Sequence, residues 1–213
     1  MDKNIKAIHA KKIDRTLKAL QKNNMEARFI HSIDELVEVI SQMVTDESTV
    51  AYGGSYTLVK LGLIDMFRNR NVKLLDRDKA GIAPEEKRRL QIEAFDSDFY
   101  FMSSNAITED GELYNVDGSG NRVAALTYGP KNVVVIVGSN KIVRDIDEAV
   151  SRVERLAAPA NCVRLNRKTP CVQTGVCMDC DSPERICNSY VVTKRQMVKD
   201  RVKVFILNDN YGY

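Results

Sequence analysis

The sequence predicts an α/β protein with a mostly parallel central sheet, helices on both faces and a small cysteine-containing segment near the C-terminus. Strand-like and helix-like segments alternate along the chain, an order typical of parallel sheets covered by helices. The clearest strand, NVVVIV at 132–137, has an unbroken apolar run, as expected of a strand buried on both faces. The 213 residues hold no internal repeat, so we expect one domain over 1–213 with the cysteine-rich segment 160–190 inside it.

The individual elements follow from hydrophobic period and capping residues. Residues 3–22 carry apolar side chains at helical spacing among charges, and 26–30 form a short strand pattern. Ser32 and Glu35 make a capping box that opens the next helix. Further strands are expected at 49–52, 72–75, 98–103 and 112–116 and in the tail VKVFILN, and further helices at about 56–68, from Pro84, and after Asn140 as far as about Pro159.

Composition narrows the class of protein. Hydrophobic residues are 44% and charged residues 29%, which are ordinary globular values. The 32 basic and 29 acidic residues are interspersed, so they indicate a solvated surface and no nucleic-acid partner. The longest apolar run, 133–137, is too short to cross a bilayer, and the N-terminus is charged from its second residue. We therefore expect a soluble cytoplasmic protein with no membrane partner.

Three polar, glycine-bearing loops follow predicted parallel strands: GGS at 53–55, the long loop after 98–103, and GSNK at 138–141. Ligands bind beyond the carboxyl ends of parallel strands, where glycine lets backbone approach closely and a following helix N-terminus favours an anion. Each loop alone is also compatible with a simple turn. Together they predict a site for a small anionic metabolite or a nucleotide, although neither a Walker loop nor a dinucleotide fingerprint is present. The candidate ligand-binding residues are Gly53, Gly54, Ser55, Thr57, Asn105, Thr108, Gly111, Asn121, Arg122, Gly138, Asn140 and Lys141.

Four cysteines, Cys171, Cys177, Cys180 and Cys187, have the spacing C-x5-C-x2-C-x6-C. A C-x2-C pair on a tight turn directs two thiolates at one ion, and two further cysteines complete four-coordination. We predict a metal site there, either an iron–sulfur cluster or zinc. Reduced cysteines packed against the sheet and a redox-switching disulfide are the alternatives. Cys162 is interpreted as a small buried apolar residue.

Three stretches resemble the LUD-domain family of lactate-utilisation protein C and its short bacterial relatives. They are GGSYTLVKLGL, SSNAITEDGELYNVDGSGNRVAALTYGPKNVVVIVGSNKIV and TPCVQTGVCMDCDSPERICN. The resemblance covers nearly the whole chain. It implies a fold similar to the ribose-phosphate isomerase, glucosamine-phosphate deaminase and CoA-transferase group, in which relatives often pair, so a homodimer is a candidate state. It also implies a link to iron–sulfur proteins that oxidise L-lactate to pyruvate, without a defined catalytic mechanism.

Three functions remain open at this point. The first is an accessory, ligand-binding or redox-linked component of L-lactate oxidation. The second is an isomerase-like or transferase-like enzyme that acts on a sugar phosphate or an acyl-CoA. The resemblance implies a carboxylate base or nucleophile for such an enzyme, and Glu109 is the candidate, whereas Asp110 and Asp117 fit turn positions. The third is an interaction module that docks through the cysteine segment. His9 and His31 lie near the N-terminal helices, away from the loops, which argues against histidine-based catalysis.

Overall fold

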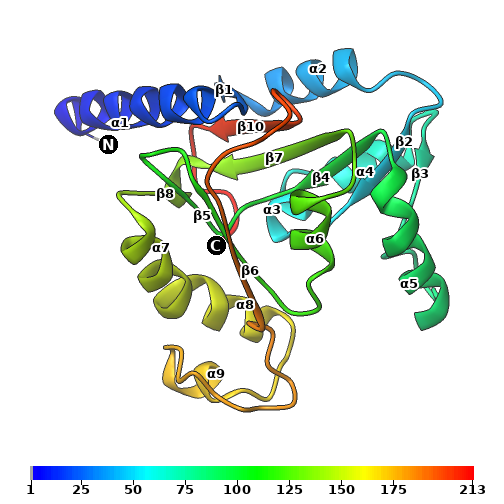
Figure 1. The fold of residues 1–213 in the computed structure, drawn as a ribbon. Helices are drawn as coiled ribbons and strands as arrows, with labels where there is room; N and C mark the ends of the chain where they lie inside the picture. The colour runs from blue at the N-terminus through cyan, green and yellow to red at the C-terminus, as the bar shows by residue number, and fades with distance from the viewer. Residues whose placement is uncertain (1) are drawn as a thin grey trace.

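A computed structural model describes residues 2–213, which form two sheets with helices around them (Figure 1). The six-stranded main sheet has the order β1-β10-β7-β4-β2-β3, and every pairing in it is parallel. Its strands are β1 (Glu26–Ile30), β2 (Thr49–Tyr52), β3 (Lys73–Leu74), β4 (Phe99–Met102), β7 (Asn132–Gly138) and β10 (Val202–Leu207). The predicted α/β class with a mostly parallel central sheet is therefore confirmed.

Helices cover both faces of the main sheet. The helices of the chain are α1 (Lys3–Lys22), α2 (Ile33–Met43), α3 (Tyr56–Lys60), α4 (Leu63–Arg68), α5 (Pro84–Glu93), α6 (Asn121–Thr127), α7 (Ile146–Arg152), α8 (Ala158–Arg164) and α9 (Pro170–Thr174). Side chains of α1 and α6 pack with Val133, Val135 and Val137 on one face. Those of α2, α3 and α4 pack with Val134 and Ile136 on the other. Successive side chains of β7 point alternately to the two faces of the sheet, and both faces are covered by an apolar core. This explains the unbroken apolar run of the strand.

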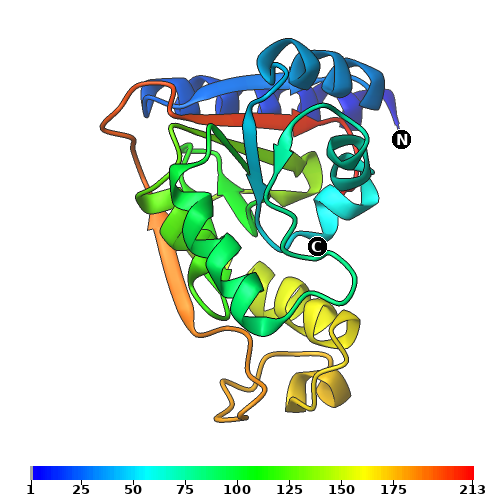
Figure 2. The ribbon, with the colours of Figure 1, turned by 90° about the vertical axis from the view of Figure 1, so that its right-hand side faces the viewer.

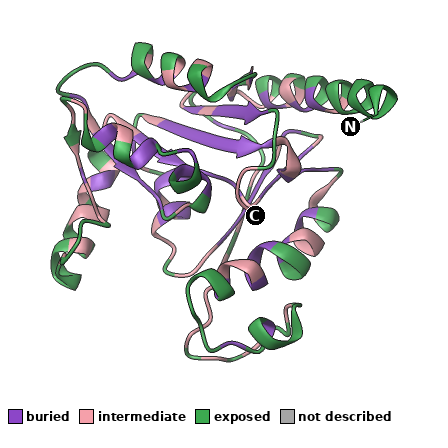
Figure 3. Cartoon of the chain, turned by 180° about the vertical axis from the view of Figure 1, so that it is seen from behind, coloured by how far each residue is buried: buried purple, intermediate pink, exposed green. Residues whose placement is uncertain are grey.

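The smaller sheet has the order β8-β5-β6-β9 and was not expected from the sequence. Its strands are β5 (Ala106–Thr108), β6 (Leu113–Asp117), β8 (Ile142–Val143) and β9 (Ser189–Thr193). Strand β6 pairs antiparallel with both β5 and β9. Helix α7, the π-helical turn that follows it and the start of α8 cover this sheet through Ala149, Val153, Ala157 and Ala158, which pack with Tyr114 and Val116. The purple strands and green outer helices of Figure 3 show how burial is concentrated in the sheets.

Several element boundaries differ from the sequence expectation. The helix predicted over 56–68 is divided at Gly62, which has a φ of 67°. The helix predicted to stop near Pro159 continues to Arg164, because a π-helical turn over Val153–Ala157 precedes the proline. Such a turn changes the backbone pairing at the point where proline has no N–H to donate. After β7 the chain makes a 3-10 turn over Ser139–Lys141 and then β8, so helix α7 does not follow the GSNK loop directly.

The cysteine-rich segment 160–190, which includes most of α8 and all of α9, lies at the end of the molecule remote from β1 and β10 (Figure 2). Its backbone is tied to the second sheet, since the amide of Asn188 donates to Asp117 O (3.0 Å), and to the π-helical turn, since the amide of Cys177 donates to Glu154 O (2.8 Å). Within the part of the chain that the structure describes, no helix combines the length and apolarity needed to cross a membrane.

Candidate functional site

A cavity of about 760 Å³ opens at the carboxyl ends of β2, β4 and β7, between the main sheet, the β5–β6 hairpin and α8. This volume lies within the range of small-molecule sites. The main sheet contributes its lining after β2 and β4, the second sheet contributes the end of β6, and α8 and the cysteine segment close the opposite side. Its polar lining includes Gly54, Ser55, Thr57, Arg77, Ser103, Ser104, Asn105, Asp117, Asn121, Arg122, Lys141, Asn161, Arg164, Arg167 and Arg185.

Lys141 lines this cavity with a side chain that is almost fully buried, the residue being 3% exposed. Its Nζ donates to Thr57 Oγ1 (3.1 Å), Ser103 Oγ (3.0 Å) and Ser104 O (3.1 Å). These partners are neutral, and the lysine ion pairs found in residues 2–213 involve other lysines. Burial, with a further contribution from the positive charges of Arg152 and Arg122, lowers the pKa of Lys141 to about 7.

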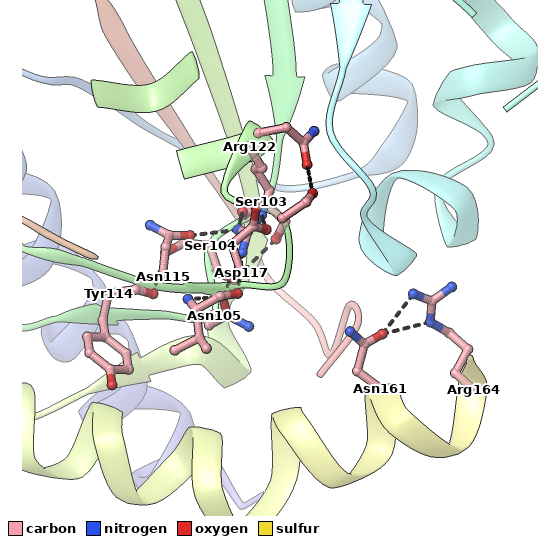
Figure 4. Close-up of polar contacts among 12 residues, drawn as sticks. Ser103, Ser104, Asn105, Tyr114, Asn115, Asp117, Arg122, Asn161 and Arg164 are labelled. Atoms are coloured by element: carbon pink, nitrogen blue, oxygen red, sulfur yellow. Dashed lines mark hydrogen bonds and ion pairs between the residues drawn. The ribbon is translucent and has the colours of Figure 1, made fainter. Parts of the chain in front are cut away.

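Arg122 is buried beside the cavity and is occupied by the protein itself. Its guanidinium donates to Asp117 Oδ1 (3.1 Å), Asn115 Oδ1 (2.7 Å) and Asn105 Oδ1 (3.0 Å), and to the carbonyl oxygens of residues 103 (2.8 Å) and 116 (2.8 Å). Five N–H groups are the full capacity of an arginine. Arg122 therefore joins the loop after β4 to the end of β6 and fixes the cavity wall (Figure 4).

Arg152 of α7 joins the two loops that follow β4 and β7. Its Nη1 donates to Asn105 O (2.7 Å) and its Nε to Asn140 O (3.4 Å), while Nη2 is buried without a partner in the described residues. Burial lowers the pKa of Arg152 to about 10. Arg122 and Arg152 both place positive charge near Lys141, whereas the carboxylate of Asp117 pairs with Arg122, and this concentrates positive potential on the inner side of the cavity.

The outer part of the cavity is also basic. Arg164 on α8 donates twice to Asn161 Oδ1 (3.0 and 2.7 Å) and lies 5.8 Å from the ring centroid of Tyr56. Tyr56 in turn stacks on Tyr213 at 5.1 Å between ring centroids. Figure 4 places Asn161 and Arg164 on the α8 side, across from Asn105 and Asp117. Counted over residues 2–213, the lining has seven basic side chains (Arg77, Lys87, Arg122, Lys141, Arg164, Arg167, Arg185) and three acidic ones (Asp78, Asp117, Glu184).

The acidic side chains of the lining are themselves engaged. Asp117 pairs with Arg122 (3.1 Å), Asp78 pairs with Lys87 (2.9 Å), and Glu184 accepts the backbone N–H of residue 168 (2.8 Å). Arg185 pairs with Asp179 (2.8 Å). Arg77 shares Asp78 with Lys87. The excess positive charge therefore comes from this shared pair, from Lys141 inside and from Arg164 and Arg167 at the mouth. The arrangement is suited chemically to hold an anion.

The structure separates the sequence-predicted ligand residues into two groups. Those at the cavity are Gly54, Ser55, Thr57, Asn105, Asn121, Arg122 and Lys141. Thr108, Glu109 and Gly111 are not part of its lining, because β5 leads away from the cavity and turns back into β6 against α1. There Asn23 donates to the carbonyl oxygens of residues 110 (2.9 Å) and 111 (3.1 Å), and Arg15 Nε donates to Glu109 Oε2 (3.0 Å). The carboxylate that reaches the cavity from this hairpin is Asp117.

Three of the predicted glycines make room for protein atoms. A Cβ on Gly53 would lie 3.0 Å from Arg122 Cγ and from Tyr100 Oη, and one on Gly111 would lie 2.5 Å from the α1 backbone. Gly138 is enclosed by Asn140 and by the backbone of residues 209 and 211. Asn140 binds this C-terminal segment by donating to Gly212 O (3.2 Å) and accepting from the amide of Tyr211 (3.3 Å). In contrast, Gly54 faces open space and Arg77.

Sequence reasoning missed several lining residues. Ser103 and Ser104 follow β4 directly, and their position at the end of a parallel strand was the signal that would have found them. Arg77 comes shortly after β3, and its buried Nε lies 3.6 Å from Asp78 Oδ1 but makes no hydrogen bond in the described chain. Asn161, Arg164 and Arg185 come from the cysteine-rich segment 160–190, and only the tertiary arrangement brings them to the sheet.

The four predicted metal ligands are free thiols in different surroundings. Cys171 and Cys187 are buried, whereas Cys177 and Cys180 are half-buried. Cys171 Sγ lies 3.2 Å from Thr169 Oγ1. Burial raises the pKa of Cys187, and Cys177 and Cys180 are close enough to raise it further. In residues 2–213 no three His, Cys, Asp or Glu side chains come together in a metal-holding arrangement, so this arrangement does not fit a four-coordinate ion. Metal binding stays a prediction.

The fold describes an α/β protein with a basic cavity at the rim of its main sheet. In a comparison with known protein families, the model of the LUD domain matches residues 13–207. The chain therefore belongs to the LUD-domain family. The predicted family is thereby confirmed. None of the curated proteins matches the chain.

Two solved structures are similar at low identity. One is a DUF162 family protein from Deinococcus radiodurans, with 11% identity, a TM-score of 0.49 and coverage of 93% of this chain and 98% of that one. The other is eIF2B delta from Chaetomium thermophilum, with 17% identity, a TM-score of 0.34 and coverage of 65% and 53%. Both TM-scores lie below 0.5, so the family assignment rests on the domain match over 13–207.

Proposed function

We propose that this chain binds a small anionic metabolite in the rim cavity and serves lactate utilisation in the cytoplasm through that binding. The observation that carries the proposal is the buried Lys141, which lines the cavity without a carboxylate partner among the described residues, together with Arg164 and Arg167 at the mouth. Buried charges of one sign are costly unless a counter-charge is present. An anion in the cavity supplies that counter-charge. The family name supports the lactate setting, and the candidate ligands within it are the carboxylates L-lactate and pyruvate.

A phosphorylated ligand is the second candidate, and the size of the cavity favours it. A volume of about 760 Å³ exceeds what a three-carbon acid fills, and the basic lining continues outward to Arg164, Arg167 and Arg185. A sugar phosphate, a nucleotide or an acyl-CoA places its phosphate at that mouth in this alternative. If the chain turns such a ligand over, Asp117 is the carboxylate that the β5–β6 hairpin brings to the cavity.

Isothermal titration calorimetry tests the proposal. The purified chain is titrated at low ionic strength with L-lactate, pyruvate, ribose 5-phosphate, ATP and coenzyme A. Binding of any one of them, weakened by added salt and by Arg164→Gln, supports a basic anion site. A matched control is Arg155→Gln, since Arg155 is an exposed residue on the same helical segment and outside the cavity lining. No heat with any of the five compounds contradicts the proposal.

The lactate setting has its own test. A strain that lacks the gene is grown on L-lactate and on glucose, with the wild-type chain or Arg164→Gln supplied in trans. The expected result is a growth defect on L-lactate alone, restored by the wild-type chain and less well by the variant. Equal growth of the deletion strain on both carbon sources would remove lactate utilisation from the proposal and leave anion binding untouched.

A further inference from the structure

The amine of Lys141 differs from the other lysines of the structure in combining burial, neutral partners and a place on a cavity. It is held on three sides, by Thr57 of α3, by Ser103 and by the carbonyl of Ser104, at distances of 3.0 to 3.1 Å. The charged groups that face it are Arg122 of α6 and Arg152 of α7, both positive. The ordinary role of a buried lysine, pairing with a carboxylate, is therefore not filled by the described residues.

The C-terminal backbone passes close to the amine of Lys141, and a glycine at the point of contact avoids a clash. Gly212 passes Lys141 with a φ of +69°, and a Cβ placed there would lie 3.3 Å from Nζ and collide with Thr57 Oγ1. Thr57 Oγ1 also donates to Tyr211 O (3.2 Å), which holds the C-terminal segment in position. The amine is consequently fixed in direction and screened from bulk water, but Lys141, Thr57 and Ser103 all remain part of the cavity lining.

We propose that Lys141 is a covalent ligand-binding residue, whose amine forms an imine with the carbonyl carbon of a small 2-oxo acid held in the cavity. The inference rests on the proposed anion-binding function and names its ligand class. A 2-oxo acid carries both features that the site can use. Its carboxylate supplies negative charge among the cations, and its carbonyl is the electrophile for an unprotonated amine.

The chemistry balances without any co-reactant. The lone pair of Nζ attacks the carbonyl carbon, and the π electrons of the C=O bond move to its oxygen, which takes up a proton. The nitrogen then loses a proton, and the carbinolamine expels water as the C=N bond forms. The hydroxyls of Thr57 and Ser103 lie within hydrogen-bond distance of Nζ and can both accept and donate, so they can relay protons between nitrogen and oxygen.

The protonation state of Lys141 supports this role. Nucleophilic attack needs the neutral amine, and an ordinary lysine is almost entirely charged at neutral pH. Burial among positive neighbours lowers the pKa of Lys141 to about 7, so a large fraction of the amine is neutral at pH 7. Desolvation in a pocket beside another cation is an established way to activate a lysine.

Reductive trapping tests the inference on the full chain. The protein is incubated with pyruvate and cyanoborohydride at pH 7, and the intact mass and the modified peptide are then measured. The expected product is one secondary amine per chain, with the mass of pyruvate minus water plus H₂, on Lys141. L-Lactate is the matched ligand control, because it carries the same charge but has a hydroxyl in place of the carbonyl, and it should give no adduct while it slows trapping of pyruvate.

Lys141→Arg is the matched protein control, because it removes the nucleophile and keeps a basic side chain. The expected result is loss of the adduct. Binding of pyruvate to the wild-type chain without a Lys141 adduct overturns this inference and leaves the proposed function standing. Adducts spread over surface lysines, unaffected by L-lactate, also overturn it. If Lys141→Arg does not fold, as judged by circular dichroism, the modified peptide and the lactate competition in the wild-type chain decide the matter.

Discussion

Buried basic residues in this protein fall into two kinds, distinguished by their partners. Arg122 has a hydrogen-bond acceptor for each N–H, including the carboxylate of Asp117. Lys141 has only neutral acceptors. Desolvation penalises a charge that has no counter-charge. Arg122 is consequently explained by the fold alone, whereas Lys141 has no counter-charge among the described residues, and the proposed anion would supply one.

The first prediction concerns the pH dependence of stability at Lys141. Its pKa is about 7 in the folded chain and about 10.4 in an unfolded one. Between these values the unfolded state binds more protons, so the free energy of unfolding rises with pH, by up to about 1.4 kcal/mol per pH unit. Below pH 7 this contribution is constant. Lys141→Met removes it, so the wild-type chain should gain stability relative to the variant as pH rises from 7 to 9.

Urea unfolding at several pH values measures this difference. Lys131→Met serves as the control, since Lys131 is exposed, and its stability should follow the wild-type profile. A constant difference between the wild-type chain and Lys141→Met over this pH range would show that Lys141 is charged in the folded protein. That result would also remove the support that the proposed imine draws from the neutral amine.

A second prediction concerns Glu109, the catalytic candidate from the sequence. Its carboxylate pairs with Arg15 in a contact whose side chains are 57% exposed on Arg15 and 24% exposed on Glu109. Exposed pairs contribute about 0–1 kcal/mol. Glu109→Gln should therefore change the free energy of unfolding by less than about 1 kcal/mol and leave ligand affinity in calorimetry unchanged. A clear loss of affinity in a folded variant would restore Glu109 as a site residue.

At the scale of elements, the β5–β6 hairpin is held against α1 by a glycine. Gly111 has a φ of +76°, and a Cβ there would lie 2.5 Å from the backbone of Ala19 and Leu20. Gly81 has a similar φ of +72° with nothing within 4 Å. Gly111→Ala should destabilise the chain by about 1–3 kcal/mol more than Gly81→Ala, because both incur backbone strain and only the first overpacks. Equal losses in urea unfolding would show that the hairpin can move away from α1.

The elements with a strong local period were predictable from the sequence. Helix 3–22, strand 26–30, strand 49–52 and the valine strand that begins at Asn132 were found because burial on a sheet or helix face leaves its period in the residues. The second sheet was missed, since β5, β8 and β9 are short and depend on partners distant in sequence. Pro159 was misread because the π-helical turn before it carries no sequence signal.

The site was predictable in location and only partly in residues. Gly54, Thr57, Asn105 and Lys141 were found because carboxyl ends of parallel strands meet at one edge. A glycine indicates that something approaches the backbone, but not whether it is ligand or protein. At Gly53 the neighbour is Arg122, which no spacing rule reveals.

The cysteine segment carries the second prediction at the scale of elements. If Cys171, Cys177, Cys180 and Cys187 bind iron or zinc, the segment must rearrange to bring the thiols together. Protein purified without air should then contain metal, and replacing Cys177 and Cys180 with Ser should abolish it. Cys162→Ala is the control, because this cysteine lies outside the predicted ligand set. Absence of iron and zinc from the anaerobic wild-type protein would contradict the metal assignment.

At the scale of the whole molecule, the cavity is where three parts of the chain meet. Its lining takes Ser103 from the main sheet, Asp117 from the second sheet and Arg185 from the cysteine segment. Arg185 also fixes that segment internally, by donating to Cys180 O (2.7 Å) and Cys187 O (2.8 Å). A ligand that contacts all three parts stabilises their mutual position, because it binds the assembled arrangement better than an opened one.

Hydrogen exchange tests this coupling. The amides of Cys177 and Asn188 bond to Glu154 O and Asp117 O, across the boundary between the cysteine segment and the rest of the chain. Their exchange reports local opening of that boundary. Saturation with the anion that calorimetry identifies should slow exchange at both amides, while amides in the exposed first turns of α1, remote from the cavity, serve as the reference and should not change. Slower exchange at the ends of β2 and β4 without any effect at Cys177 and Asn188 would mean that the ligand contacts the main sheet alone, and that the arginines of α8 and the cysteine segment take no part in holding it.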